Sequence, residues 1–224
     1  IKSSAASDVY KRQVAELGGA KSGYHAVVAN LLDLNDLSNG FQQAISALGG
    51  RLDILVNGAG LQYRCPSEEF PEDAWDRIMG VNIKGVFFMS QLAGKVMLKQ
   101  GKGKIINIAS TNSFIGLRNM PAYVSSKGGV KQLTMALSSE WSGRGINVNA
   151  IAPGYMDTEM NVALTDPKNP KFTQQRYDEL TQRIPAHRWG TPDDMKGCCI
   201  FLASHASDYL GGAIIPVDGG YLVM

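Results

Sequence analysis

The sequence predicts an α/β fold in which a parallel sheet lies between two layers of helices. Short apolar runs rich in β-branched residues recur along the chain, without the alternation of a half-exposed strand. Strands that are buried on both faces need such continuous hydrophobicity. Helical patterns separate the runs, and this regular order favours right-handed crossovers. The predicted strands are residues 25–30, 52–57, 104–109, 146–152 and 213–218.

Three helices are predicted between these strands. Residues 36–48 begin at Asp36, a suitable cap, and end at a pair of glycines. Residues 72–98 carry an apolar stripe at helical spacing. Residues 121–142 begin with Pro121, which suits the first turn of a helix.

Residues 155–190 interrupt the alternation with three prolines and two predicted short helices. Long connections that follow the carboxyl end of a strand commonly cover a ligand site. We therefore predict that this segment, the substrate lobe, covers the site. The lobe has five basic and five acidic residues, so its net charge does not indicate an anionic substrate.

Composition excludes several classes of protein. The 224 residues are 44% hydrophobic and carry a net charge of +2, which suits one compact domain and gives no basic stripe for nucleic acid. Three cysteines, two of them adjacent, favour free thiols and a cytoplasmic location. The three histidines lack metal-ligand spacing, and no run is long and apolar enough to cross a membrane. We expect no metal, nucleic-acid or membrane partner.

One segment groups residues suited to proton transfer. Tyr123 and Lys127 are four residues apart, so on a helix they lie one turn apart, where an ammonium favours the phenolate. Ser110 directly follows a predicted strand, at the edge where parallel sheets open their ligand crevice. This spacing predicts a site for hydride transfer assisted by a proton donor.

These residues belong to a longer set of motifs, and with them the chain resembles the short-chain dehydrogenase/reductase family. The set occurs in the family's order and spacing after residue 14. Runs such as G-L-Q-Y-R-C-P and R-I-P-A-H-R-W-G are similar to the 2-deoxy-D-gluconate 3-dehydrogenase and gluconate 5-dehydrogenase branch. The motifs are Asn57-Gly58-Ala59-Gly60, Asn82, Ser110, Tyr123 with Lys127, and Pro153-Gly154.

The resemblance implies a Rossmann-like, doubly wound fold and a reaction. NAD or NADP would exchange hydride with a secondary alcohol or ketone, most simply a sugar acid or related polyol. Tyr123 would be the acid or base, Ser110 would bond the reacting oxygen, and Lys127 would favour the phenolate. Asn82 would hold a water that links Lys127 to solvent. Homo-oligomers, tetramers or dimers, would form through the long helices and the last strand.

The resemblance also implies a cofactor surface. Asn30 and Leu31, at the end of the first predicted strand, would face the adenine. Backbone at Asn57, Gly58, Ala59 and Gly60 would approach the adenosine ribose. Tyr123 and Lys127 would also contact the cofactor. Pro153, Gly154 and Thr158 would lie at the nicotinamide, with a helix cap as the alternative role for Thr158.

Substrate contacts are predicted beside the catalytic residues. Arg64 could clamp a carboxylate with two parallel hydrogen bonds, and its alternative is an exposed surface arginine. Arg183 and Arg188 are weaker candidates for the same carboxylate contact. Ser113 is either a loop hydroxyl or a substrate contact.

The start of the chain departs from the family pattern. Residues 1–13 are interpreted as a non-native or disordered leader, and residues 14–224 as one truncated domain with the substrate lobe. No glycine-rich turn precedes residues 25–30, so we expect the first βαβ unit, and the neighbour of that strand, to be lacking. Two alternatives stay open: a fragment or paralogue that binds no dinucleotide, or a reductase of β-ketoacyl thioesters or small ketones.

Overall fold

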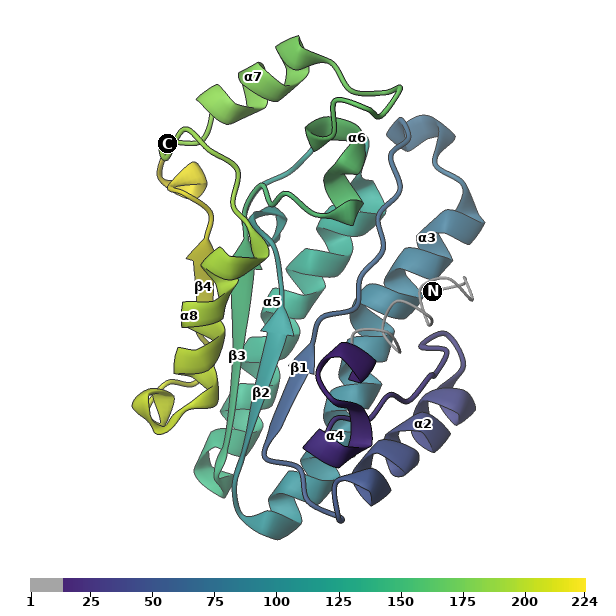
Figure 1. Cartoon of the computed structure of the whole chain (residues 1–224), viewed down its shortest axis with the longest axis vertical. Coiled ribbons are helices and arrows are strands. Elements are labelled where there is room, and N and C mark those ends of the chain that lie inside the picture. Colours follow the sequence, from purple (N-terminus) through teal and green to yellow (C-terminus); the bar gives the residue numbers. More distant parts are fainter. Residues whose placement is uncertain (1–13) are drawn as a thin grey trace.

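A computed structural model describes residues 14–224, so the predicted leader lies outside the described residues. Its core is a parallel sheet of four strands in the order β1-β2-β3-β4 (Figure 1). Four of the five predicted strands are thereby confirmed. They are β1 (Ile54–Asn57), β2 (Gly103–Ile108), β3 (Ile146–Pro153) and β4 (Ile214–Val217).

Helices cover both faces of the sheet, which confirms the predicted three-layer α/β fold (Figure 1). Neighbouring residues of β2 point to opposite layers. Ile105 packs with Met97 and Trp141 on one face, whereas Ile106 packs with Leu202 on the other. The helices are α2 (Leu34–Ala47), α3 (Glu72–Met79), α4 (Val86–Gln100), α5 (Pro121–Trp141), α6 (Val162–Thr165), α7 (Gln174–Gln182) and α8 (Pro192–Ala203).

The last crossover differs from the expectation that all crossovers share one hand. Helices α4 and α5, which lead into β2 and β3, pack on the same face, but α8, which leads into β4, packs on the opposite face. Because the strands succeed one another in one direction across the sheet, this change of face reverses the hand of the crossover. The lobe, residues 155–190, lies between β3 and α8 and carries the chain from one face to the other.

The helix predicted over residues 72–98 is not continuous. Helices α3 and α4 are joined by a wider π-helical turn, Gly80–Gly85. A β-carbon on Gly80 would lie 2.5 Å from Leu32 Cδ2, so glycine lets the segment after residues 25–30 approach the turn closely. Such turns are frequent at functional sites, and this one contains Asn82.

The strand predicted over residues 25–30 is wrong. The segment is irregular and pairs with no strand among the described residues. Its side chains pack instead on α2, where the Ala29 β-carbon lies 2.6 Å from the position that a β-carbon on Gly40 would take. A continuous apolar run cannot make a strand without a partner for its backbone groups, and Val28 is 57% exposed.

The predicted cap of α2 is also wrong by three residues. Asp33 caps the helix, and its carboxylate accepts hydrogen bonds from the backbone amides of Asn35 and Asp36. Asp36 lies in the first turn and accepts from the backbone amide of Asn30 at 2.7 Å. Both aspartates are suitable caps, but only Asp33 has the extended backbone that the position requires.

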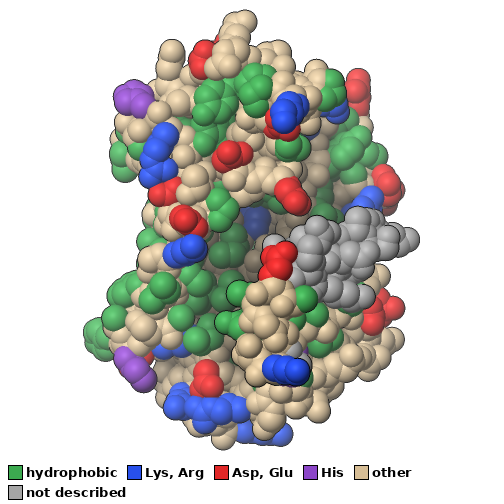
Figure 2. All heavy atoms as spheres, viewed as in Figure 1, with side chains coloured by type: hydrophobic (Ala, Val, Ile, Leu, Met, Phe, Trp, Pro, Cys, Tyr) green, Lys and Arg blue, Asp and Glu red, His purple; other side chains and the backbone are tan. Residues whose placement is uncertain are grey.

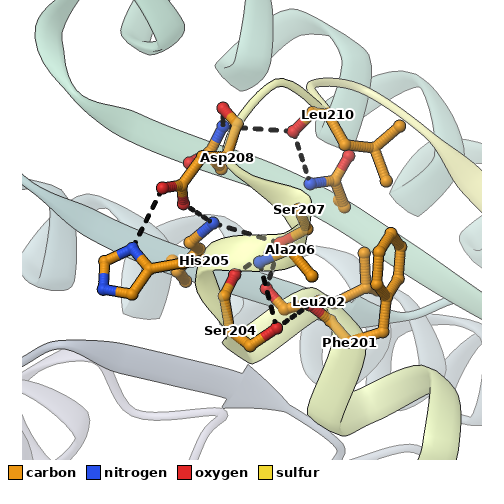
Figure 3. A network of polar contacts seen from close by, with 11 residues as sticks. Phe201, Leu202, Ser204, His205, Ala206, Ser207, Asp208 and Leu210 are labelled. Atoms are coloured by element: carbon orange, nitrogen blue, oxygen red, sulfur yellow. Dashed lines mark hydrogen bonds and ion pairs between the residues drawn. The ribbon is translucent and has the colours of Figure 1, made fainter.

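A polar network fixes the loop after α8 to the amino-terminal edge of the sheet (Figure 3). Lys104 Nζ, at the start of β2, donates to Asp208 at 2.6 Å and to Ser207 at 3.1 Å. The side-chain amide of Asn147 donates to the carbonyl oxygens of Asp208 and Leu210. This network lies at the edge opposite the ligand crevice, so it anchors β4 without entering the site.

Residues 14–224 form neither a membrane-spanning helix nor a cluster of metal-ligating side chains. No helix there combines the length and hydrophobicity that a membrane span requires. Nor do three His, Cys, Asp or Glu side chains of those residues gather in a group that could hold a metal ion.

Candidate active site

The carboxyl ends of the strands meet beneath the lobe, and the predicted catalytic residues lie there. Ser110 follows β2, Gly154 follows β3, and Tyr123 is in the first turn of α5. Together with Arg64, these three residues line one pocket with about 420 Å³ of empty space, part of it open to solvent. Figure 2 shows the face hollowed between the lobe and the ends of the strands.

Lys127 is deeply buried beside this pocket. The residue is 4% exposed, and its Nζ donates to the Ile108 carbonyl oxygen at 2.6 Å. The same nitrogen lies 5.8 Å from the centroid of the Tyr123 ring, so the two side chains share one region as the spacing predicts. Burial lowers the pKa of Lys127 to about 8, because the charged form loses its hydration.

The electrostatics of Tyr123 differ from the prediction. Burial raises the pKa of its phenol above the usual value, and the Ser110 hydroxyl and the positive charge of Arg64 only partly oppose that rise. Lys127 is not among the groups that lower it, because its own pKa of about 8 means that the lysine loses its proton before the phenol ionises. In this structure the phenol therefore favours its protonated form.

Asn82 holds the site together through its side chain. It is fully buried in the π-helical turn, and its Oδ1 accepts from the Leu61 amide at 2.8 Å. Its Nδ2 donates to the Leu61 carbonyl oxygen and to Ser126 Oγ. Asn82 thus ties the loop after β1 to α5. Its predicted role in holding a water stays a prediction.

Arg64 lies in the loop after β1 and reaches the pocket, as predicted. Partial burial lowers the pKa of its guanidinium, and Arg176 of α7 lowers it further, whereas Tyr155 and Tyr123 raise it. Two other arginines named from the sequence do not line this pocket. Arg183 lies over the Tyr221 ring, and Arg188 pairs with Asp194 at 2.8 Å.

Ser113 has a structural contact. Its hydroxyl donates to the Lys127 carbonyl oxygen at 2.7 Å, so it ties the loop after Ser110 to α5. Of the two roles considered from the sequence, the loop hydroxyl is the one that this bond supports.

The pocket contains polar residues that sequence reasoning missed. Side chains with hydroxyl or amide groups line it beside the predicted residues. Gln62 is two residues from Arg64, and Asn112 is two residues from Ser110, so proximity to the motifs was the available signal. The residues are Gln62, Thr111, Asn112, Tyr155 and Asn161.

Comparison with known proteins identifies the family. The family model described as enoyl-(acyl carrier protein) reductase matches residues 3–222. A 2-dehydro-3-deoxy-D-gluconate 5-dehydrogenase from Escherichia coli is 46% identical over 211 residues, which are 94% of this chain and 79% of that protein. The chain belongs to the short-chain dehydrogenase/reductase family.

Two more relatives agree with this family. A 2-dehydro-3-deoxy-D-gluconate 5-dehydrogenase from Bacillus subtilis is 48% identical over 172 residues, which are 77% of this chain and 65% of that protein. The crystal structure of a gluconate 5-dehydrogenase from Burkholderia cenocepacia, in complex with NADP and tartrate, is 36% identical with a TM-score of 0.85. The match covers 96% of this chain and 81% of that one. The resemblance found in the motifs is confirmed.

Members of the short-chain dehydrogenase/reductase family use a dinucleotide, and part of the surface for it is formed here. Leu31, Asn57, Gly58 and Ala59 line one pocket beside β1, and their roles toward the cofactor stay predictions. A β-carbon on Gly58 would meet no atom within 4 Å, so the space beside its backbone is open to a ligand. Apolar side chains make up most of the rest of this lining, and Lys127 Nζ would lie 3.8 Å from a β-carbon on Gly60.

Three predicted cofactor residues differ in the contacts of their side chains. The Asn57 side chain points into the core, where it donates to Ser90 and Asn107, so only its backbone can face a ligand. Asn30 Oδ1 accepts from the Leu32 amide, and its predicted contact with the adenine stays a prediction. Thr158 precedes a short 3-10 turn, and its side chain makes no capping bond there.

Proposed function

We propose that the protein is an NAD(P)-dependent oxidoreductase that exchanges hydride between the cofactor and a secondary alcohol or ketone of a sugar acid or related polyol. The observation that carries the proposal is one pocket lined by Ser110, Tyr123 and Arg64, with Lys127 buried beside it. The names of the relatives support a sugar-acid substrate. Residues 14–224 would act as one domain.

In this proposal the chain's own groups move the proton and hold the reacting oxygen. The cofactor, when bound, supplies or accepts the hydride. Tyr123 gives its proton to the substrate oxygen in reduction and takes it in oxidation. Ser110 donates a hydrogen bond to the same oxygen, where charge develops in the transition state. Lys127, with a pKa of about 8, can carry a proton near neutral pH.

The raised pKa of Tyr123 favours the proton-donor role in the structure as described. Oxidation requires the phenolate, and positive charge stabilises it. Arg64 already supplies part of that charge, and an oxidised nicotinamide ring would add to it. The direction of catalysis should therefore depend on the charge of the bound cofactor.

The lining of the pocket suits a polyhydroxylated acid. Amide and hydroxyl side chains from Gln62, Asn112 and Asn161 can bond sugar hydroxyls. The guanidinium of Arg64 can take a carboxylate in two parallel hydrogen bonds. Of the residues that line this pocket, Arg64 is the only one with a full positive charge.

We also propose that the protein is a homo-oligomer, a dimer or tetramer, in the cytoplasm. Exposed apolar side chains on α3, on α5 and at the C-terminus supply apolar surface for association. They are Trp75, Met135, Val223 and Met224. The three cysteines are free thiols, which suits a reducing compartment. Light scattering after size-exclusion chromatography measures the number of subunits.

An assay of reduced cofactor tests the activity. The protein is given NAD⁺ or NADP⁺ with D-gluconate, 2-dehydro-3-deoxy-D-gluconate or a neutral four-carbon polyol. Sugar acids should be oxidised with the higher kcat/KM. Arg64→Met should raise KM for gluconate by about tenfold or more, because the variant loses a charge-assisted pair with the carboxylate. The same variant should leave KM for the polyol unchanged. Equal kcat/KM for acids and neutral polyols would contradict the proposal.

A further inference from the structure

Asn119 has an unusual backbone directly before the helix that carries Tyr123. Its φ is 62°, in the left-handed region, and only His187 among the other non-glycine residues of 14–224 has a positive φ. Met120 is the residue that caps α5, so Asn119 is the last residue before the cap. Conformations of this kind persist where the surrounding structure holds them, and they cluster at functional sites.

The carbonyl oxygen of Asn119 has a specific partner. It accepts a hydrogen bond from the backbone amide of Cys65 at 2.9 Å. Within the described chain, this is the one backbone–backbone hydrogen bond that residues 58–65 make to any other segment. The bond therefore joins the loop of Arg64 to the start of the helix of Tyr123.

This bond holds the backbone next to Arg64, whereas Asn82 holds the same loop three residues earlier, at Leu61. Its side chain makes no hydrogen bond or ion pair to any of the residues that the structure describes, so its own contacts do not fix the guanidinium. Cys65, the next residue, is fixed by the Asn119 carbonyl. Arg64, Met120 and Tyr123 all line the same pocket.

We propose that Asn119 is a positioning residue for carboxylate recognition. Its left-handed turn directs the carbonyl oxygen to Cys65 and so sets the distance between the Arg64 guanidinium and the Tyr123 phenol. A residue that requires a negative φ would turn this carbonyl away and free the Arg64–Cys65 end of the loop, which Asn82 holds only at Leu61, while Tyr123 stays with α5. The inference rests on the proposed function, in which Arg64 binds the carboxylate of the substrate.

A pair of variants separates the backbone effect from the loss of the side chain. Asn119→Gly keeps the left-handed conformation, whereas Asn119→Val strongly disfavours it, because a β-branched residue rarely adopts positive φ. The hydrogen-exchange rate of the Cys65 amide reports whether its bond to Asn119 is formed, and the measurement does not require an active enzyme. We expect exchange at least about tenfold faster in Asn119→Val, and unchanged in Asn119→Gly, with the amides of β2 as an internal control for global opening.

Steady-state kinetics measure the consequence for substrate binding. Asn119→Val should raise KM for D-gluconate about tenfold, because the Arg64 guanidinium would no longer be placed for its charge-assisted bond to the carboxylate. Its kcat and its KM for a neutral four-carbon polyol should stay within about twofold of wild type, and Asn119→Gly should match wild type throughout.

Three results would overturn the inference. The first is unchanged exchange at Cys65 in Asn119→Val, and the second is an unchanged KM for gluconate in that variant while Arg64→Met raises it. The third is an equal fall in kcat for both substrates, because the turn would then act on Tyr123. If Arg64→Met itself leaves KM for gluconate unchanged, the proposed carboxylate clamp fails, and faster exchange at Cys65 would then show only a structural role.

Discussion

The buried ammonium of Lys127 should make the stability of the protein depend on pH in a way that a single substitution removes. The side chain is 4% exposed, and its one hydrogen-bond acceptor among residues 14–224 is the Ile108 carbonyl oxygen. One neutral acceptor replaces little of the lost hydration. Burial accordingly lowers the pKa of the ammonium from 10.5 to about 8.

The sign of the effect follows from proton binding. An unfolded chain keeps the lysine protonated up to a pH of about 10.4, whereas the folded chain releases the proton near pH 8. Between these values the unfolded state binds more protons, so the free energy of unfolding rises with pH. The pKa difference corresponds to about 3 kcal/mol in total, and the folded state bears that full penalty below pH 8.

Urea unfolding at several pH values measures this term. Tryptophan fluorescence follows the transition in wild type and in Lys127→Met, which keeps the length of the side chain and removes the charge. The free energy of unfolding of wild type, minus that of the variant, should rise by about 3 kcal/mol between pH 7 and pH 10.5. Other titrating groups cancel in this difference.

The matched control is Lys95→Met, on an exposed position of α4. Its difference from wild type should stay nearly constant over the same range of pH. A constant difference for Lys127→Met would refute the reasoning, because it would mean that the buried lysine titrates as it does in the unfolded chain. A falling difference would show that the Ile108 carbonyl oxygen outweighs the lost hydration.

Three further outcomes are expected. Tyr123→Phe should lower kcat at least about a hundredfold, as the loss of an acid–base group does, and near-normal turnover would remove Tyr123 from that role. Gly154→Ala would place a β-carbon 2.7 Å from the Asp218 Cα, so thermal unfolding should show that the protein loses about 1–3 kcal/mol of stability. The control Gly143→Ala should lose little stability, because nothing lies within 4 Å of its added β-carbon. Asn57→Ala should cost an amount similar to that of Gly154→Ala in urea, since its two buried partners would lose a donor.

The sequence predicted the architecture well because its signals were local and repeated. Continuous apolar runs predicted the four observed strands, and Pro121 predicted the first residue of α5. The failures share one cause, which is dependence on a partner elsewhere in the chain. Residues 25–30 have the composition of a strand, but no described strand pairs with them. The hand of the last crossover depends on the route of the lobe, which no local pattern encodes.

In the site, too, local spacing was predictable, whereas contacts between distant segments were not. Spacing placed Tyr123 and Lys127 one turn apart, and the structure brings them together. Spacing could not show that the ammonium is turned to a backbone carbonyl, nor that the Asn57 side chain is directed into the core. Gln62 was missed for a similar reason. Its contact with the lobe, a hydrogen bond to the Met160 carbonyl oxygen, spans 98 positions of the sequence.

The two proton-carrying groups of the site are both shifted toward their neutral forms. Burial raises the pKa of Tyr123 and lowers that of Lys127, so the same dry surroundings disfavour phenolate and ammonium alike. An ionised pair therefore needs charge supplied from outside the pair. Arg64 provides some of it, since its positive charge lowers the pKa of Tyr123. A carboxylate bound to Arg64 would neutralise that charge and raise the pKa of Tyr123 again. On the proposed function, sugar acids would accordingly require a higher pH for oxidation than neutral polyols do, and pH profiles of kcat for the two classes measure this difference directly.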